Sequence, residues 1–284
     1  ATLYPAKTMI EIGHFNTLTI KSYNGMQLHL EGDEFGDILL TDKQVPRDAK
    51  TGDSLDVFIY TGSDSEILAT CKKPFAEMGS VAWLKVVSVN QAGAFLDWGI
   101  AKDLLVPFAE QDYELEVGDY CLAKVYMDEQ HRIAASTELN NFILDEVSYL
   151  KEGDKVSLII AKKTDLGFKA VVDDSFWGVL YYNEVFQALK EGQKLTGYIK
   201  KIREDRKVDL SLNKTGHTHV APLTQQIITR LEQNNGHLDL SDKSSPEEIN
   251  AAFGVSKKVF KHAIGVLYKE RRITLTKTSI TLNK

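Results

Sequence analysis

The sequence predicts a mainly β protein, in which three copies of a small five-stranded barrel precede a small α+β domain. Three glycine pairs share one spacing of 39 residues, namely Gly13 with Gly52, Gly79 with Gly118, and Gly153 with Gly192. Residues around these glycines alternate between apolar and polar, which is typical of strands with one buried face. The end of the chain instead shows helical spacing. Such self-similarity indicates structural repeats, and the predicted domains are 1–72, 73–141, 142–215 and 220–284.

The second repeat shows the order of elements most clearly. Its apolar alternation predicts five strands, which begin near residues 81, 94, 103, 120 and 132. The third strand stops at Pro107, because proline cannot donate a hydrogen bond within a sheet. Five strands in about 65 residues are too few for two packed sheets and favour a closed Greek-key barrel.

The other two repeats follow the same order. The third is organised around Gly153, Gly167 and Gly178, and the first, more loosely, around Gly13, Gly25 and Gly36. Between the second and third barrels, the segment from Asn140 to Val147 predicts a short helical connection.

The last segment of the chain changes to helical spacing. Ser245 is expected to cap a helix that begins at Pro246 and ends at Gly254, and Ser256 to cap the next helix. The predicted elements are a helix over 223–235, a strand over 237–240, a helix over 246–254, a helix from 257 to about 272, and a hairpin of strands 273–276 and 280–282. Helix, strand, helix, helix and hairpin is the order of a winged helix.

The third of these helices predicts one exposed basic stripe and one buried face. The stripe contains Lys258, Lys261, His262, Gly265 and Lys269, and Arg271, Arg272 and Lys277 add charge beside it. The buried face contains Val259, Phe260, Ala263 and Leu267. In helix-turn-helix proteins a helix at this position enters the major groove of DNA. The deep major groove of RNA admits no helix, so the stripe would instead hold phosphates. A solvated lysine face is also common.

The second repeat resembles the S1 RNA-binding domain, which is an OB-fold barrel. The residues that carry the resemblance are Gly79-Ser80-Val81, Gly93 to Asp97, Asp103 to Pro107, Val117-Gly118-Asp119, Asp128, and Arg132-Ile133-Ala134. The third repeat resembles the same domain from Gly153 to Ser211, and the first does so more weakly. Three such barrels before a winged helix resemble the conserved virulence factor B family of bacterial proteins. This resemblance covers nearly the whole chain and implies RNA binding in post-transcriptional control of gene expression.

The resemblance also implies which residues bind. An OB barrel binds single strands on one sheet face, where rings stack on bases and cations follow the phosphates. In the second repeat Phe95 matches one of two aromatic positions, and Asp128 and Arg132 match a charged pair. Ala92 replaces the other aromatic residue and Pro107 replaces a histidine. Because half of the side chains of a barrel strand face inward, burial of Phe95 in the core is the alternative to a binding role.

In the third repeat the corresponding face combines Lys169, Tyr181, Lys200 and Lys207. Leu166 stands at the first aromatic position, with Phe168 beside Lys169. The first repeat has Leu28, Leu40 and Glu66 at the matching positions, and we interpret it as structural or protein-binding. Trp98 and Trp177 are expected in a core or between domains. Trp83 has an outward phase that is consistent with an interdomain contact.

The charge distribution and the absence of catalytic motifs narrow the classes of function that the sequence allows. The net charge is −6, with ten basic against six acidic residues over 220–284, so this segment carries +4 and residues 1–219 carry −10. The C-terminal segment is therefore the expected electrostatic anchor for a nucleic acid. No phosphate-binding glycine loop, HExxH or GxSxG is present, and no enzymatic activity, cofactor or metal is expected. His217 and His219 are expected to be solvated, and Cys71 and Cys121 to be reduced thiols.

The sequence thus predicts a protein that binds single-stranded RNA through its second and third barrels and its winged helix. A cytoplasmic location without a membrane contact is expected, because no apolar run approaches the length that spans a bilayer. Two alternatives stay open. One is a DNA-binding regulator that acts through the winged helix, and the other is an adaptor whose acidic first barrel holds a protein partner.

Overall fold

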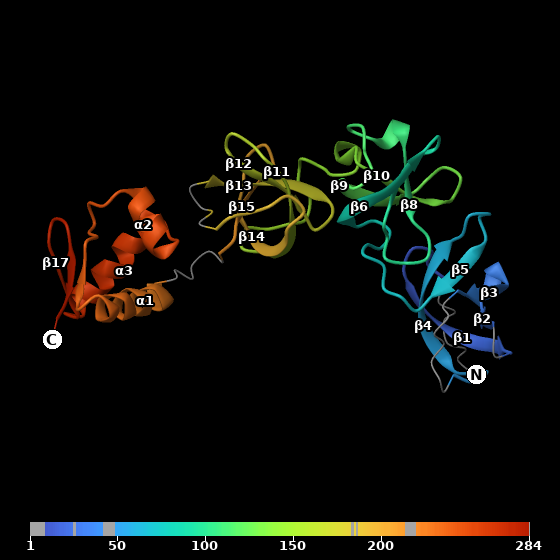
Figure 1. Ribbon diagram of the computed structural model, residues 1–284, viewed down its shortest axis with the longest axis horizontal. Coiled ribbons are helices and arrows are strands. Elements are labelled where there is room, and N and C mark those ends of the chain that lie inside the picture. Colours follow the sequence, from blue (N-terminus) through green and yellow to red (C-terminus); the bar gives the residue numbers. More distant parts are fainter. Residues whose placement is uncertain are drawn as a thin grey trace. The chain divides into compact units, whose positions relative to one another are not determined.

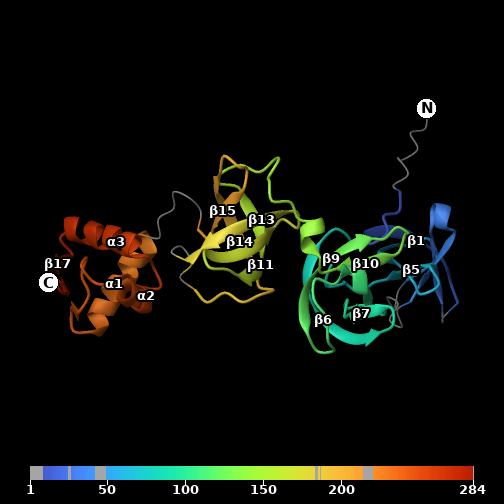
Figure 2. The ribbon, with the colours of Figure 1, turned by 90° about the horizontal axis from the view of Figure 1, so that it is seen from above.

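The computed structural model describes residues 9–24, 27–41, 49–182, 185, 187–213 and 220–283. It contains three five-stranded barrels and a C-terminal domain of three helices and a small sheet (Figure 1, Figure 2). The predicted mainly β fold class is confirmed. The chain divides into two compact units, residues 1–143 and 144–284. Gly25, His217 and His219 lie outside the described residues.

The first barrel is closed. Its strands are β1 (Phe15–Tyr23), β2 (Leu28–Glu31), β3 (Asp37–Leu40), β4 (Ser54–Thr61) and β5 (Ile67–Thr70), in the order β1-β2-β3-β5-β4. A 3-10 turn, η1 (Asp33–Phe35), precedes β3. Strand β1 pairs with β4 along its first half and with β2 from Ile20 onward, and the pairing with β2 is irregular after Ile20. Leu28 and Leu40 are buried in the core, so neither offers a surface for a base.

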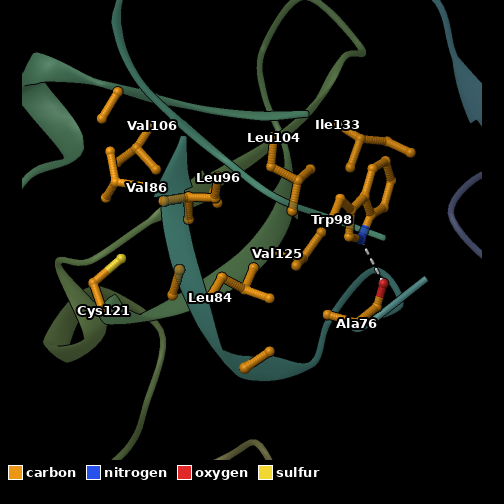
Figure 3. Close-up of a cluster of buried hydrophobic side chains, with 14 of the residues drawn as sticks. Ala76, Leu84, Val86, Leu96, Trp98, Leu104, Val106, Cys121, Val125 and Ile133 are labelled. Atoms are coloured by element: carbon orange, nitrogen blue, oxygen red, sulfur yellow. Dashed lines mark hydrogen bonds between the residues drawn. The ribbon is translucent and has the colours of Figure 1, made fainter. Parts of the chain in front are cut away.

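The second barrel has the same strand order. Its strands are β6 (Val81–Asn90), β7 (Gly93–Leu96), β8 (Leu104–Pro107), β9 (Tyr120–Met127) and β10 (Ile133–Ser136). They form a sheet in the order β10-β9-β6-β7-β8. Its two end strands, β10 and β8, lie next to each other in space, but no backbone hydrogen-bond pairing between them is recorded among the described strands. The turn η2 (Phe108–Glu110) follows β8. Figure 3 shows the interior, where the indole Nε1 of Trp98 donates to the carbonyl of Ala76 at 2.7 Å.

The first barrel has a core of its own and also packs two side chains into the core of the second barrel. Phe58 and Tyr60 of β4 belong to the same buried cluster as Trp98, and the rings of Phe58 and Trp98 meet edge to face with centroids 5.4 Å apart. The ammonium of Lys102 donates to the carbonyls of Thr61, at 2.6 Å, and Gly62, at 2.7 Å. Burial lowers the pKa of Lys102, against the opposing effect of Glu66. These apolar and polar contacts fix the two barrels to each other.

The third barrel is closed and has the order β11-β12-β13-β15-β14. Its strands are β11 (Lys155–Lys163), β12 (Gly167–Val172), β13 (Phe176–Tyr181), β14 (Lys194–Ile202) and β15 (Val208–Ser211). The short helix predicted over 140–147 is wrong, because only the 3-10 turn η3 (Leu139–Asn141) forms there. The backbone of Leu144 instead bonds to Ser175 and Trp177, and Val147 enters the barrel core. These tertiary partners satisfy the backbone better than an isolated helical turn would.

The C-terminal domain has the predicted order of elements. They are α1 (Val220–Gln233), β16 (His237–Leu238), α2 (Pro246–Phe253), α3 (Lys257–Lys269), β17 (Ile273–Leu275) and β18 (Ile280–Leu282). Ser245 and Glu248 form a reciprocal capping box at α2, and Gly254 ends it in a left-handed conformation. Helix α3 ends before the predicted Arg272, because Arg271 has a φ of 56° and reverses the chain. Within the described residues, no helix is long and apolar enough to cross a bilayer.

Candidate nucleic-acid interface

One turn recurs at the same place in all three barrels, directly before the fifth strand. In each, a backbone N–H donates to the carbonyl four residues later, and the residue before that carbonyl is left-handed. The closing pairs are Gly62 with Glu66, Asp128 with Arg132, and Arg203 with Lys207, at 2.7, 2.9 and 3.0 Å. The turn therefore presents two side chains at equivalent positions in the second and third barrels, and one, Glu66, in the first. Arg203 is the counterpart of Asp128, and Lys207 is the counterpart of Arg132.

In the second barrel the two side chains of this turn bind each other. The guanidinium of Arg132 donates from Nε and Nη2 to Oδ2 of Asp128, at 2.9 and 2.8 Å. Oδ1 of Asp128 accepts from the backbone N–H groups of Gln130 and Arg132. Burial would raise the pKa of Asp128, but these hydrogen bonds and the charge of Arg132 outweigh it, so that the pKa lies below its usual value. The charge of Arg132 is thus largely neutralised within the barrel.

Phe95 lies on the outer side of β7. Its neighbours Ala94 and Leu96 are buried, whereas Phe95 is half-buried. Gly93 begins the strand, and an added Cβ there would lie 2.2 Å from the carbonyl oxygen of Val106. The strand is therefore held close to β8, with the Phe95 ring facing outward. A role for this ring in stacking stays a prediction.

Trp83 also faces outward, but its contact is within its own barrel. Its ring stacks on that of Tyr120, with centroids 6.2 Å apart and an interplanar angle of 17°. The ring thus contacts the neighbouring strand of its own sheet, and the expected interdomain contact stays a prediction.

The third barrel has a hollow of about 410 Å³ beside the same turn. Lys169, Arg203, Lys207 and Trp177 line it, together with the acidic residues Asp145 and Asp165. The ammonium of Lys169 lies 3.8 Å from the centre of the Trp177 ring, and burial lowers its pKa against the opposing charge of Asp145. The ammonium of Lys207 is exposed and makes no ion pair or hydrogen bond with any residue that the structure describes. The hollow therefore combines an aromatic wall with available positive charge.

Arg203 holds Tyr181 at the edge of this site. Its Nη2 donates to the Tyr181 hydroxyl at 2.6 Å, and its Nε and Nη2 donate to Oδ1 of Asp209 at 2.8 and 2.5 Å. The hydrogen bond with Asp209 raises the pKa of Arg203. The Tyr181 hydroxyl also donates to Asp209 at 3.3 Å. Tyr181 is therefore fixed in orientation. The sequence pattern missed Arg203, although its place in the repeat, equivalent to Asp128, marks it.

A second hollow of about 660 Å³ flanks the turn between β11 and β12. Lys163 and Tyr182 line it, and the Tyr182 hydroxyl donates to the carbonyl of Thr164 at 2.6 Å. The Lys163 ammonium lies 5.6 Å from the Tyr182 ring centre. Sequence reasoning missed both residues. The pair of tyrosines at 181–182 was the signal that marked Tyr182. Lys200, by contrast, lies at an irregularity of β14 and lines neither hollow.

The basic stripe on α3 is exposed. The side chains of Lys258, Lys261, His262 and Lys269 are all exposed, whereas Phe260, Ala263, Ile264 and Leu267 are buried. Arg271 and Arg272 are exposed directly after the helix. The Lys261 ammonium lies 3.8 Å from a carboxylate oxygen of Asp242, so its charge is partly paired. The helix thus has the predicted apolar and basic sides, and the binding role of the basic side stays a prediction.

Comparison with known proteins agrees with this architecture. An S1 domain model matches residues 12–72 and 78–138, and a CvfB-like winged helix domain model matches residues 225–282. These matches and the fold define a protein of S1-type barrels with a terminal winged helix.

The chain belongs to the conserved virulence factor B family. It is 24% identical over 283 residues to a conserved virulence factor B of Staphylococcus epidermidis, covering 96% of this chain and 95% of the relative. It is 28% identical over 246 residues to the uncharacterized protein YitL of Bacillus subtilis, covering 83% and 82%. A solved structure of a multidomain protein with nucleic acid binding domains from Streptococcus pneumoniae is 24% identical, covers 96% of this chain and 98% of that one, and has a TM-score of 0.42.

Proposed function

We propose that this protein binds single-stranded RNA reversibly and thereby acts in post-transcriptional control of gene expression in bacteria. The observation that carries the proposal is the hollow of the third barrel. There, three cationic residues and Trp177 line one hollow, and Arg203 holds Tyr181 beside it, on a barrel with the same strand order as the two that the S1 domain model matches. Proteins that bind single strands combine stacking surfaces of this kind with cations along the backbone path. The proposal includes a cytoplasmic location, where transcripts are available.

The parts of the chain have different roles in this proposal. The third barrel supplies stacking and charge through Lys169, Tyr181 and Lys207. The second barrel supplies the Phe95 ring, while Asp128 and Arg132 keep its hairpin closed. The winged helix supplies phosphate contacts through its basic stripe, namely Lys258, Lys261, His262, Lys269, Arg271 and Arg272. No bond is made or broken, so the proposed activity is binding and not catalysis.

Titrations of the full chain with single-stranded RNA, single-stranded DNA and duplex DNA of one length, each at two salt concentrations, test the proposal. We expect the tightest binding for single-stranded RNA. Its logarithmic affinity should fall with the logarithm of salt by about 0.7 for each phosphate that the protein neutralises. Tighter binding of duplex DNA would replace this function with that of a DNA-binding regulator. Absence of all nucleic-acid binding would favour an adaptor that holds a protein partner.

A further inference from the structure

A groove of about 790 Å³ lies between α1 and α2 of the winged helix. It is lined by side-chain amides, an arginine and an aromatic ring, namely Gln225, Gln226, Gln233, Asn234, Arg230 and Phe253. No carboxylate and no lysine line it within the described part of the domain. The groove therefore carries one positive charge among its lining residues, in contrast to the several lysines of the α3 stripe.

Arg230 is held in place at the centre of this groove. Its Nη1 donates to the carbonyl of Ala252 near the end of α2, and its guanidinium carbon lies 5.3 Å from the centre of the Phe253 ring. The Phe253 ring stacks in turn on Phe260, with centroids 5.5 Å apart and an interplanar angle of 28°. Phe260 is fully buried in the domain core. The flat guanidinium is thus fixed to the core through two rings, so a ligand that stacks on it loses little side-chain entropy.

The amides around Arg230 supply both donors and acceptors. Gln225, Gln226 and Gln233 are exposed along α1, while Asn234 uses one donor to bond the carbonyl of Arg230 at 2.7 Å. Glutamine and asparagine amides match the paired donors and acceptors on base edges. An arginine plane is also a stacking surface for unpaired bases. A phosphate, by contrast, would find a single cation here, so the groove suits the base of a nucleotide better than its phosphate.

We propose that this groove binds one unpaired nucleobase of the RNA strand, stacked on the guanidinium of Arg230 and hydrogen-bonded at its edge by Gln226 and Gln233. This inference rests on the proposed RNA-binding function and deepens it. The α3 stripe then determines how strongly the strand is held, because it neutralises phosphates. The α1–α2 groove determines which base is preferred, because its amides discriminate between base edges.

The test measures the affinities of the full chain for labelled homopolymeric RNAs of uridine, cytidine and adenosine, all of one length, at two salt concentrations. Arg230→Lys keeps the charge and removes the planar fork, and Gln226→Ala with Gln233→Ala removes the edge contacts. We expect each variant to reduce the preference between homopolymers by about tenfold, the size of a good amide–base pair. The salt slope should not change, since no phosphate contact is lost.

Lys258→Ala is the matched control on the same domain. It should lower the salt slope and leave the preference between homopolymers intact. Thermal unfolding shows whether every variant is folded. If Arg230→Lys unfolds the domain, the variant with both glutamines replaced still tests the inference, because the side chains of Gln226 and Gln233 are exposed. Unchanged base preference in a folded groove variant would overturn the inference, as would a wild-type protein that binds all homopolymers equally. A wild-type protein that binds no RNA would instead overturn the proposed function itself.

Discussion

Lys207 and Arg132 occupy the same position in two barrels, and the structure predicts opposite consequences when each is replaced by alanine. The Lys207 ammonium is exposed beside the aromatic hollow and has no partner in the part of the chain that the structure describes. Its removal should change the free energy of unfolding by less than about 0.5 kcal/mol, as for other surface substitutions. Its charge is available to a phosphate. The logarithmic salt slope of RNA binding should therefore fall by about 0.7.

Arg132→Ala should show the reverse pattern. This change removes two donors to Asp128, whose side chain is 18% exposed while that of Arg132 is 45% exposed. Because the pair is partly solvated, the expected loss of unfolding free energy is about 1 kcal/mol. The salt slope should hardly change, since Asp128 already neutralises the guanidinium.

Urea unfolding and RNA titrations at several salt concentrations, applied to both variants of the full chain, test this contrast. The wild-type protein supplies the reference for both measurements. If Arg132→Ala lowered the salt slope as much as Lys207→Ala and kept native stability, the proposed difference between a paired and an available cation would be refuted.

Three further predictions concern other parts of the chain. Phe95→Ala should weaken single-strand binding by about 1 to 3 kcal/mol with little change in urea unfolding, because the ring faces outward; a loss of stability with unchanged affinity would assign the ring to packing. Joint replacement of Lys258, Lys261 and Lys269 by alanine should lower affinity and the salt slope at native thermal stability, and an unchanged slope would remove the stripe from the interface. Burial raises the pKa of Cys121 to about 12, with a further contribution from Asp119. This thiol should therefore resist alkylation at mildly alkaline pH until urea unfolds the chain, whereas rapid labelling of the folded protein would contradict its burial.

The depressed pKa of Asp128 predicts how stability depends on pH. A carboxylate whose pKa is lower in the folded than in the unfolded state stabilises the fold above its unfolded pKa, which is about 3.9. This contribution is lost as the pH falls through the lower, folded value. Asp128→Asn should therefore flatten the acid limb of a plot of unfolding free energy against pH. If the variant lost unfolding free energy at acid pH as steeply as the wild-type protein, other carboxylates would be the cause of that loss.

The fold could be predicted from the sequence because its signals are local. Alternation along each strand and the capping residues Ser245 and Ser256 act within a few positions of the elements that they define. The connection after the second barrel could not be predicted in this way, since Leu144 finds its backbone partners in a strand that begins at Phe176. Parts of the site share this difficulty. The repeat marks the position of Arg203, but its bonds to Tyr181 and Asp209 join three segments of the barrel that are distant in sequence, which no local pattern shows.

The recurring turn before the fifth strand is used differently in the three barrels. In the third barrel this turn presents Arg203 and Lys207 to a hollow, and in the second barrel Asp128 and Arg132 bind each other. In the first barrel the equivalent turn starts at Gly62, whose carbonyl accepts from Lys102 of the second barrel.

The absence of a side chain at Gly62 lets Glu66 lie close over the turn. A Cβ there would lie 2.1 Å from a carboxylate oxygen of Glu66, and the other carboxylate oxygen accepts from the backbone N–H of Asp64. Glu66 therefore folds back over its own turn. The position that carries a cation in the other two barrels thus carries a carboxylate here, which accepts a hydrogen bond from its own turn. The contact with the second barrel therefore uses the backbone of this turn together with the packed rings of Phe58 and Trp98.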